Sequence, residues 1–257
     1  MNNDLKQVIF DYLSGIKEDP QVVGVVLTGS AGREDMDQYS DIDNVIFVNG
    51  STTIKEGKFM LGKYLFDSRI VNIEEIQSNW SEDMFFAYLN SSIVYDPGNI
   101  ISKIITAKRE EWTTRMLKRL QLALVELSVI YEFSDNWKGL KTVTHYHKFL
   151  DRNDYISAHR ILNIGFEIIL DILYLINNSP IPDIKNKIRL LPKVKILPND
   201  ANKLVNEVVL ITSFDVNDLN RRYKALILFV NFIKDNIEKS QLHISDNIYQ
   251  YYLANRA

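Results

Sequence analysis

Two aspartates that stand two positions apart are the residues of this 257-residue sequence best suited to chemistry. Asp41 and Asp43 directly precede an apolar run, residues 45–48, that predicts a buried strand. In an extended chain, side chains two positions apart project to the same face, so the two carboxylates point together. Two like charges this close repel each other unless a cation lies between them, and Mg²⁺ takes oxygen ligands of this kind. The pair therefore predicts a divalent-metal site.

A Gly-Ser pair stands earlier in the chain, after another apolar run. Residues 22–27 are mostly β-branched, and the run is short enough for a buried strand. Gly29-Ser30 follows shortly after and ends the apolar run. A turn at this point would free backbone N–H groups and the Ser30 hydroxyl to face phosphate oxygens. A metal site beside a phosphate cradle suits phosphoryl or nucleotidyl transfer, in which metal ions stabilise the attacking and leaving oxygens.

Two further side chains near these motifs are candidates for nucleotide binding. Arg33 follows Ser30 by three positions, and the guanidinium group suits the geometry of phosphate. An exposed arginine without a ligand is the alternative. Ser40 directly precedes Asp41 and could bond either the backbone or a phosphate.

Hydrophobic periodicity predicts the elements that must position these side chains. Residues 3–17 carry apolar side chains at three-and-four spacing, which predicts an amphipathic helix. After the first strand we expect a short helix from about residue 31 to 37 and a second strand from 42 to 48. Residues 58–73 predict one long strand or a hairpin, with Gly62 as a bulge or as the turn.

The rest of the chain is predicted to be mostly helical. A capped helix at 81–89 and a short strand that begins at Ile93 precede a long helix from about 100 to 133. Further helical segments are expected at 138–150, 154–177, 183–190, 200–213, 216–238 and 244–254. We therefore predict an α+β protein, with a mixed sheet and helices in a domain at 1–100 and a helical bundle at 101–257.

Composition narrows the classes of protein that this chain can belong to. Hydrophobic residues make up 46% and charged residues 25%, as in ordinary globular proteins. The net charge of −3 gives no overall basic field, which argues against a polynucleotide substrate. The absence of cysteine excludes disulfides and thiolate metal sites and fits a reducing compartment. We see no signal peptide and no apolar run near the ~20 residues of a membrane span, so we expect a cytoplasmic protein.

The order of these motifs resembles the signature of the DNA polymerase β-like nucleotidyltransferases. Gly29-Ser30, a spacer, Asp41-Ile-Asp43 and the two flanking strands match that signature over roughly the first third of the chain. The resemblance implies transfer of a nucleoside monophosphate from an NTP, which we expect to be ATP, to a hydroxyl, with release of pyrophosphate. It also implies that Asp41 and Asp43 hold two Mg²⁺ ions, one for the triphosphate and one for the attacking hydroxyl. Gly29 and Ser30 would then hold the β- and γ-phosphates.

In that family a third carboxylate enters the metal site from a later strand. Asp67 is the one acid within residues 58–73, and it is our candidate for a metal ligand or general base. A polar residue on the solvent face of a strand is the alternative. If the register of the strand differs, Glu56, Glu74 and Glu75 are the substitutes.

The second half resembles the helical half of antibiotic and related small-molecule nucleotidyltransferases. The resemblance rests on the stretch that begins at Asn153-Asp154, on the apolar helix after it, and on the break at 177–180. It implies a small-molecule acceptor, such as an aminoglycoside or lincosamide antibiotic, in a pocket that is often acidic. Acids that could contribute are Glu82, Asp83, Glu132, Asp135 and Asp154. A homodimer that shares its cleft is also compatible with this layout.

Two other functions stay open. An enzyme of the same kind could modify a protein or an RNA, as in toxin–antitoxin systems, and a catalytically silent nucleotide-binding module could keep the same fold. The position of Asp67 distinguishes an active enzyme from a catalytically inactive binding module. If Asp67 points away from Asp41 and Asp43 and no other acid takes its place, the binding module is favoured. His145 and His147 lie two positions apart and cannot share a helix face, so a metal site there is disfavoured. For His159-Arg160 we expect a structural role.

Overall fold

The computed structural model describes residues 3–127 and 145–239 of the chain. It divides the chain into two compact units, Met1–Trp112 and Thr113–Ala257. Helix α5 (Ile100–Leu127) runs across the division, which lies between Trp112 and Thr113. The domain boundary predicted near residue 100 stays a prediction. The helical predictions for 128–133, 138–144 and 244–254 lie outside the described residues, as do Glu132 and Asp135.

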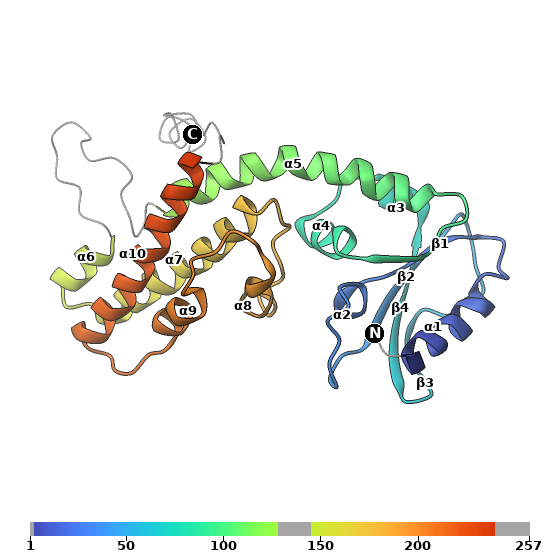
Figure 1. The fold of residues 1–257 in the computed structure, drawn as a ribbon, viewed down its shortest axis with the longest axis horizontal. Coiled ribbons are helices and arrows are strands. Elements are labelled where there is room, and N and C mark those ends of the chain that lie inside the picture. The colour runs from blue at the N-terminus through green and yellow to red at the C-terminus, as the bar shows by residue number, and fades with distance from the viewer. Residues whose placement is uncertain (1–2, 128–144, 240–257) are drawn as a thin grey trace. The chain divides into compact units, whose positions relative to one another are not determined.

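The first unit is built on a five-stranded mixed sheet with the strand order β3-β4-β2-β1-β5 (Figure 1). The strands are β1 (Val22–Leu27), β2 (Ile42–Val48), β3 (Gly57–Leu61), β4 (Tyr64–Asn72) and β5 (Ser92–Tyr95). β2 and β4 run parallel, and each other pair of neighbours is antiparallel. The strands predicted at 22–27 and 42–48 are confirmed to the residue.

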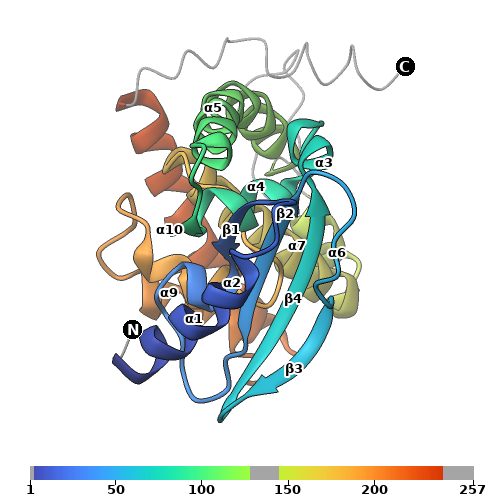
Figure 2. The same ribbon diagram turned by 90° about the vertical axis from the view of Figure 1, so that its right-hand side faces the viewer.

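Residues 57–72 form a hairpin rather than one long strand, and Figure 2 shows its two strands at the edge of the sheet beside β2. Leu61 pairs with Tyr64, so Gly62 and Lys63 make a two-residue turn. Gly62 has a φ of +60°, which a residue without Cβ adopts at little cost. Of the two predicted roles for Gly62, the turn is therefore correct.

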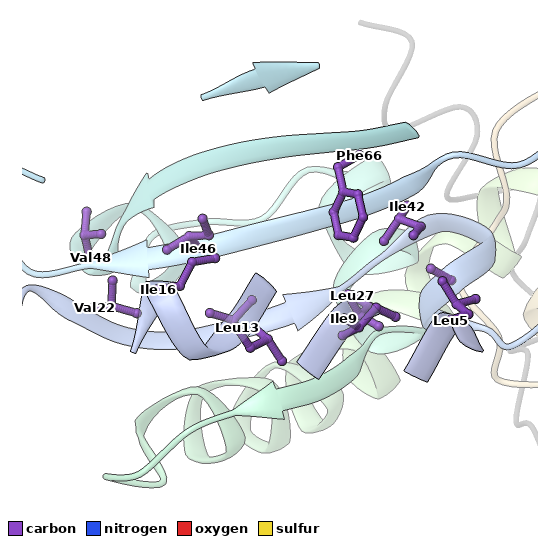
Figure 3. Packing of buried hydrophobic residues seen from close by; sticks show 12 residues of the cluster. Leu5, Ile9, Leu13, Ile16, Val22, Leu27, Ile42, Ile46, Val48 and Phe66 are labelled. Atoms are coloured by element: carbon purple, nitrogen blue, oxygen red, sulfur yellow. The ribbon is translucent and has the colours of Figure 1, made fainter. Parts of the chain in front are cut away.

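Helix α1 (Asn3–Ile16) covers one face of the sheet. Its apolar stripe buries Leu5, Ile9, Leu13 and Ile16. Figure 3 shows these side chains packed against Val22, Leu27, Ile42, Ile46, Val48 and Phe66 of the strands. A helix of 14 residues is marginal by itself, so burial of this stripe stabilises it where it lies.

Aromatic side chains form a core on the other face of the sheet. They come from β2, from α4 (Glu82–Leu89) and from the first half of α5, with Trp80 in the loop before α4. The ring of Phe47 lies 5.9 Å from that of Tyr88, Trp80 lies 5.1 Å from Tyr88, and Phe85 lies 5.3 Å from Trp112. Because both faces are covered, the central strands are nearly continuous apolar runs.

The short helix after β1 differs from its prediction. Helix α2 spans Gly29–Gly32, whereas the sequence favoured residues 31 to 37. Glu34 adopts a left-handed backbone with φ +59°, and the N–H of Asp35 donates to the carbonyl of Ser30 at 3.0 Å. This is the geometry of a Schellman motif, which ends a helix. The predicted helix is therefore wrong at both ends, because the Gly-Ser pair begins the helix instead of preceding it.

The second unit consists of helices in its described part. They are α6 (His145–Asp151), α7 (Tyr155–Ile176), α8 (Lys187–Leu190), the 3-10 turn Leu191–Lys193, α9 (Ala201–Val209) and α10 (Val216–Lys239). Asp154 caps α7 by accepting a hydrogen bond from the N–H of Ser157 at 3.1 Å. With the sheet of the first unit, this confirms the α+β class. None of the helices in the described ranges has the length and apolar character needed to cross a membrane.

Candidate active site

The pairing of β2 with β4 brings two of the predicted acids together. Asp43 and Asp67 are register partners in this parallel ladder, so their side chains leave the same face of the sheet. Asp41 lies two positions before Asp43 and adds a third carboxylate. One oxygen of each of the three lies within 4.8 Å of the others. Among the described residues, this acidic triad (Asp41, Asp43 and Asp67) is the one such group of potential metal ligands.

The Gly-Ser turn lies against this triad. The N–H of Thr28 donates to the backbone carbonyl of Asp43 at 2.9 Å, which joins the end of β1 to the start of β2. Gly29 follows with φ +56°, and a Cβ at this position would stand 2.0 Å from Asp43 Oδ2. No side chain fits there, so glycine is what allows the Asp43 carboxylate to approach the backbone of the turn.

The structure brings in one residue that sequence reasoning missed. Lys58 pairs with Asp67 across the β3–β4 hairpin. Its Nζ lies 3.3 Å from Asp67 Oδ2 and 3.4 Å from Asp41 Oδ2. Hydrogen bonds to these two carboxylates, that to Asp67 first, raise the pKa of Lys58, so its ammonium is charged at neutral pH. The sequence contains a signal for this contact, because a two-residue turn at Gly62 and Lys63 places Lys58 opposite Asp67.

A second group that sequence reasoning missed lies on the opposite face of the same strands. The side chains of Asn44 and Ser68 are both buried, and they are also register partners of β2 and β4. Asn44 Nδ2 donates to Ser68 Oγ at 2.8 Å, and the Tyr12 hydroxyl of α1 lies 2.7 Å from Ser68 Oγ. This polar cluster is one position along each strand from Asp43 and Asp67, and it holds the two strands in register.

Arg33 and Ser40 have partners within the chain. Arg33 Nε lies 3.4 Å from Asp35 Oδ2, and its guanidinium stands 5.5 Å from the centre of the Phe86 ring. Only 12% of the Arg33 side chain is exposed, so the alternative of a plain exposed arginine is wrong. Ser40 Oγ donates to Asp37 Oδ1 at 3.1 Å and accepts from the N–H of Asp37 at 3.0 Å. Both side chains thus shape the loop that leads from α2 to Asp41.

The three substitutes for Asp67 lie elsewhere. The carboxylate of Glu56 accepts a 3.4 Å hydrogen bond from the N–H of Ile70. Glu74 and Glu75 occupy the first turn of α3 (Ile73–Gln77), which begins where β4 ends, whereas Asp67 lies near the start of that strand. None of them belongs to the described acidic triad.

The donor set of the triad fits a hard divalent cation. Three carboxylates converge with one oxygen each, and about a third of the Asp41 and Asp67 side chains is exposed. Mg²⁺ prefers carboxylate oxygen ligands and keeps part of its hydration shell, which a partly open site permits. The ammonium of Lys58 already meets two of these carboxylates, which shows that a cation is accommodated there.

Among the described residues, several of the other predicted side chains have a structural role within their own unit. Glu82 and Asp83 occupy the first turn of α4, where they interact with its positive end. Asp154 caps α7, and the hydrogen bond from Ser157 lowers its pKa. His159 is buried, with its Nδ1 2.6 Å from Arg222 Nη1, which is the structural role expected of it.

The part of the chain that holds this site is similar to a known family. Residues 11–119 match the family model described as "Nucleotidyltransferase domain". Among curated proteins, none matches the sequence. A crystal structure of a nucleotidyltransferase-like protein from Exiguobacterium sibiricum 255-15 is similar over 91% of this chain and 76% of that chain, with 14% sequence identity and a TM-score of 0.44. The family match includes the acidic triad, the Gly-Ser turn and Lys58.

Proposed function

Residues 11–119 are a nucleotidyltransferase domain, and from this premise we propose that the chain transfers a nucleoside monophosphate from an NTP to a hydroxyl of a small molecule. ATP is the expected donor, and pyrophosphate is the leaving group. The observation that carries the proposal is the convergence of Asp41, Asp43 and Asp67 beside the Gly29 turn. Three carboxylates with oxygens within 4.8 Å of one another repel each other, and a divalent metal ion would offset this repulsion more fully than the single charge of Lys58 does.

We propose Mg²⁺ as the cofactor, with Asp41, Asp43 and Asp67 as its protein ligands. Two ions would be held between these carboxylates and the substrate. When bound, they would neutralise the triphosphate and favour ionisation of the acceptor hydroxyl.

The protein's own groups would position both substrates and move a proton. The acceptor oxygen forms a bond to the α-phosphorus as the bond from that phosphorus to the pyrophosphate oxygen breaks. Asp67 would complete the ligands of the second ion or accept the hydroxyl proton as a general base. The backbone of Gly29 and the hydroxyl of Ser30 would receive the β- and γ-phosphates. For Arg33 and Ser40 we retain a nucleotide-binding role through the loop that they shape.

The helical C-terminal unit supports a small acceptor. In the antibiotic nucleotidyltransferases that the sequence resembles, the helical half helps to bind the acceptor. A net charge of −3 also disfavours binding to the phosphates of a polynucleotide. We therefore propose a cationic, hydroxyl-rich molecule, with an aminoglycoside or a lincosamide as the first candidates.

Pyrophosphate release tests the reaction. The protein is incubated with Mg²⁺ and each of the four NTPs against a panel of aminoglycosides and lincosamides. We expect acceptor-dependent release that Asp41→Asn and Asp43→Asn each lower by at least about 10²-fold, because each removes a carboxylate that would hold the metal ion, and the metal ion would stabilise the negative charge of the transition state. Asp11→Asn, on the exposed face of α1, is the matched control and should retain activity. Full activity in Asp41→Asn would sink the mechanism.

The same assay separates the competing functions. If pyrophosphate is released only with an added protein or RNA and with none of the small molecules, the proposed acceptor class is contradicted but the proposed reaction is supported. Binding of Mg·ATP without release for any acceptor would instead indicate a silent nucleotide-binding module. The acceptor dependence therefore decides among the three.

A further inference from the structure

Lys58 stands where its charge opposes that of the acidic triad. Its ammonium lies within 3.4 Å of one oxygen of Asp41 and one of Asp67, so it bridges two of the three proposed metal ligands. The residue comes from β3, one of the two edge strands of the sheet, and 60% of its side chain is exposed. No backbone movement is needed for it to leave, because a flexible four-carbon stem separates the ammonium from the strand.

We propose that Lys58 is an internal counter-cation that occupies the acidic triad before metal binds and is displaced by Mg²⁺. This inference rests on the proposed metal site and adds a regulatory residue to it. A magnesium ion bound to Asp41 Oδ2 and Asp67 Oδ2 at the ~2.1 Å of a coordination bond would lie within about 5.5 Å of the Lys58 ammonium, which is 3.4 and 3.3 Å from the same two oxygens, and two cations this close repel each other. The lysine and the metal ion therefore compete for the same two carboxylate oxygens.

The competition has two consequences. Without metal, Lys58 offsets repulsion among the carboxylates, so the triad keeps its shape. When metal binds, the free energy needed to break the two ion pairs of Lys58 makes metal binding weaker. A solvent-exposed ion pair is weak, so the effect is modest and the site stays responsive to metal and nucleotide concentration.

A purely structural role is the competing account. An edge strand exposes unpaired backbone groups, and a lysine there discourages pairing with another chain. That role does not require Lys58 to contact the carboxylates, and it does not change their affinity for a cation. Metal affinity therefore distinguishes the two accounts, and enzymatic turnover is not needed for the test.

The experiment measures Mn²⁺ binding by electron paramagnetic resonance, without nucleotide, on the full chain. The variants are Lys58→Met, Lys58→Arg and Lys63→Met. Lys63 lies on the same hairpin, but its Nζ pairs with Asp4 at 2.7 Å, so it is the matched control for loss of one surface charge. We expect Lys58→Met to lower the dissociation constant about three- to tenfold, whereas Lys58→Arg and Lys63→Met stay within about twofold of wild type.

The controls separate failure of this inference from failure of the proposed metal site. Wild type that binds no Mn²⁺, or binds it equally well after Asp43→Asn, would remove the metal site itself. A second outcome would overturn the counter-cation role alone. In it, wild type binds Mn²⁺ and Asp43→Asn does not, but Lys58→Met binds Mn²⁺ as wild type does or more weakly. A tighter Lys58→Met together with an equally tighter Lys63→Met would also overturn it, since the gain would then reflect net charge.

Discussion

Asn44 and Ser68 exchange hydrogen bonds across β2 and β4, one position along each strand from Asp43 and Asp67. Nδ2 of Asn44 donates to Oγ of Ser68 at 2.8 Å, and Oγ of Ser68 donates to Oδ1 of Asn44 at 3.0 Å. Because side chains alternate between the faces of a sheet, the polar pair and the acidic pair lie back to back. A slip of β4 by one residue would place Ser68 on the acidic face, so the buried pair fixes which residue meets Asp43.

Ser68→Ala should destabilise the first unit and loosen the acidic triad. The change leaves the buried amide of Asn44 without its partner, which costs about 1–3 kcal/mol of unfolding free energy. We also expect weaker Mn²⁺ binding, because the spacing of Asp43 and Asp67 is no longer held from behind. Urea denaturation and Mn²⁺ titration measure the two effects.

Tyr12→Phe is the control for Ser68→Ala. It removes one hydroxyl from the cluster but keeps the Asn44–Ser68 pair, so the affinity for Mn²⁺ should not change. Equal Mn²⁺ loss in both variants would contradict a positioning role for the pair.

Gly29→Ala should impair metal binding more than it impairs folding. The added Cβ would stand 2.0 Å from Asp43 Oδ2, so the carboxylate must turn away. The positive φ adds a backbone cost of about 1–2 kcal/mol. Gly62→Ala is a matched control, since Gly62 has φ +60° and no atom lies within 4 Å of the place that an added methyl group would take. We expect similar losses of stability in the two variants by urea denaturation, but loss of Mn²⁺ binding only in Gly29→Ala. Normal Mn²⁺ binding in Gly29→Ala would show that Asp43 is not needed in its present position.

Asp218 in the second unit should stabilise the fold down to acidic pH. Burial opposes its ionisation, but hydrogen bonds from Thr212 and Arg221 outweigh burial and lower its pKa to about 2. A carboxyl with a lowered folded pKa contributes stability above its unfolded value of about 4, and this contribution is lost as the pH falls towards 2. The difference in unfolding temperature between wild type and Asp218→Asn should therefore shrink as the pH falls below about 4. A difference that does not change with pH would refute this assignment.

His159 should make the same unit sensitive to mild acid. Arg222 only donates hydrogen bonds, so the 2.6 Å contact requires Nδ1 of His159 to accept, and the ring is neutral with its proton on Nε2. Burial, and after it the charge of Arg222, lowers the pKa of His159. Stability is then complete above the unfolded value of about 6.5 and declines as the pH falls through and below it. Thermal unfolding between pH 8 and 5 should show this decline in wild type but not in His159→Gln, in which an amide oxygen can still accept.

His147→Gln serves as the control for the loss of a histidine. His147 lies on α6, where its ring meets that of Tyr223 with 5.2 Å between the ring centres. Its variant keeps the His159–Arg222 contact and should therefore keep the decline seen in wild type. If His159→Gln kept it as well, the acid sensitivity would come from another group.

The class of reaction was predictable from local sequence. Gly29-Ser30 and Asp41-Ile-Asp43 lie within stretches whose strands form from their own apolar patterns, and the family match over residues 11–119 confirms a nucleotidyltransferase. The α+β class followed from the same periodicity. The antibiotic acceptor stays a prediction, because acceptor recognition depends on side chains gathered from distant segments.

Helix ends were less predictable than helix existence. The helix at α2 was expected too late in the chain because Glu34, which has no special sequence signal, takes the left-handed conformation that ends it. For Gly62 the sequence allowed a bulge or a turn, and only the pairing of Leu61 with Tyr64 decides for the turn. In both cases the choice depends on hydrogen bonds whose partners are set by the rest of the fold.

The sequence by itself determined which residues could bind a metal ion and on which strands most of them lie. The period of a strand makes Asp41 and Asp43 point the same way, whatever the remainder of the chain does. Only the tertiary structure decided that Asp67, and neither Glu56 nor Glu74, completes the triad, and that Lys58 reaches it. The reason is register: the β2–β4 and β3–β4 ladders align residues far apart in sequence, and that alignment is set by hydrogen bonds and buried contacts between strands.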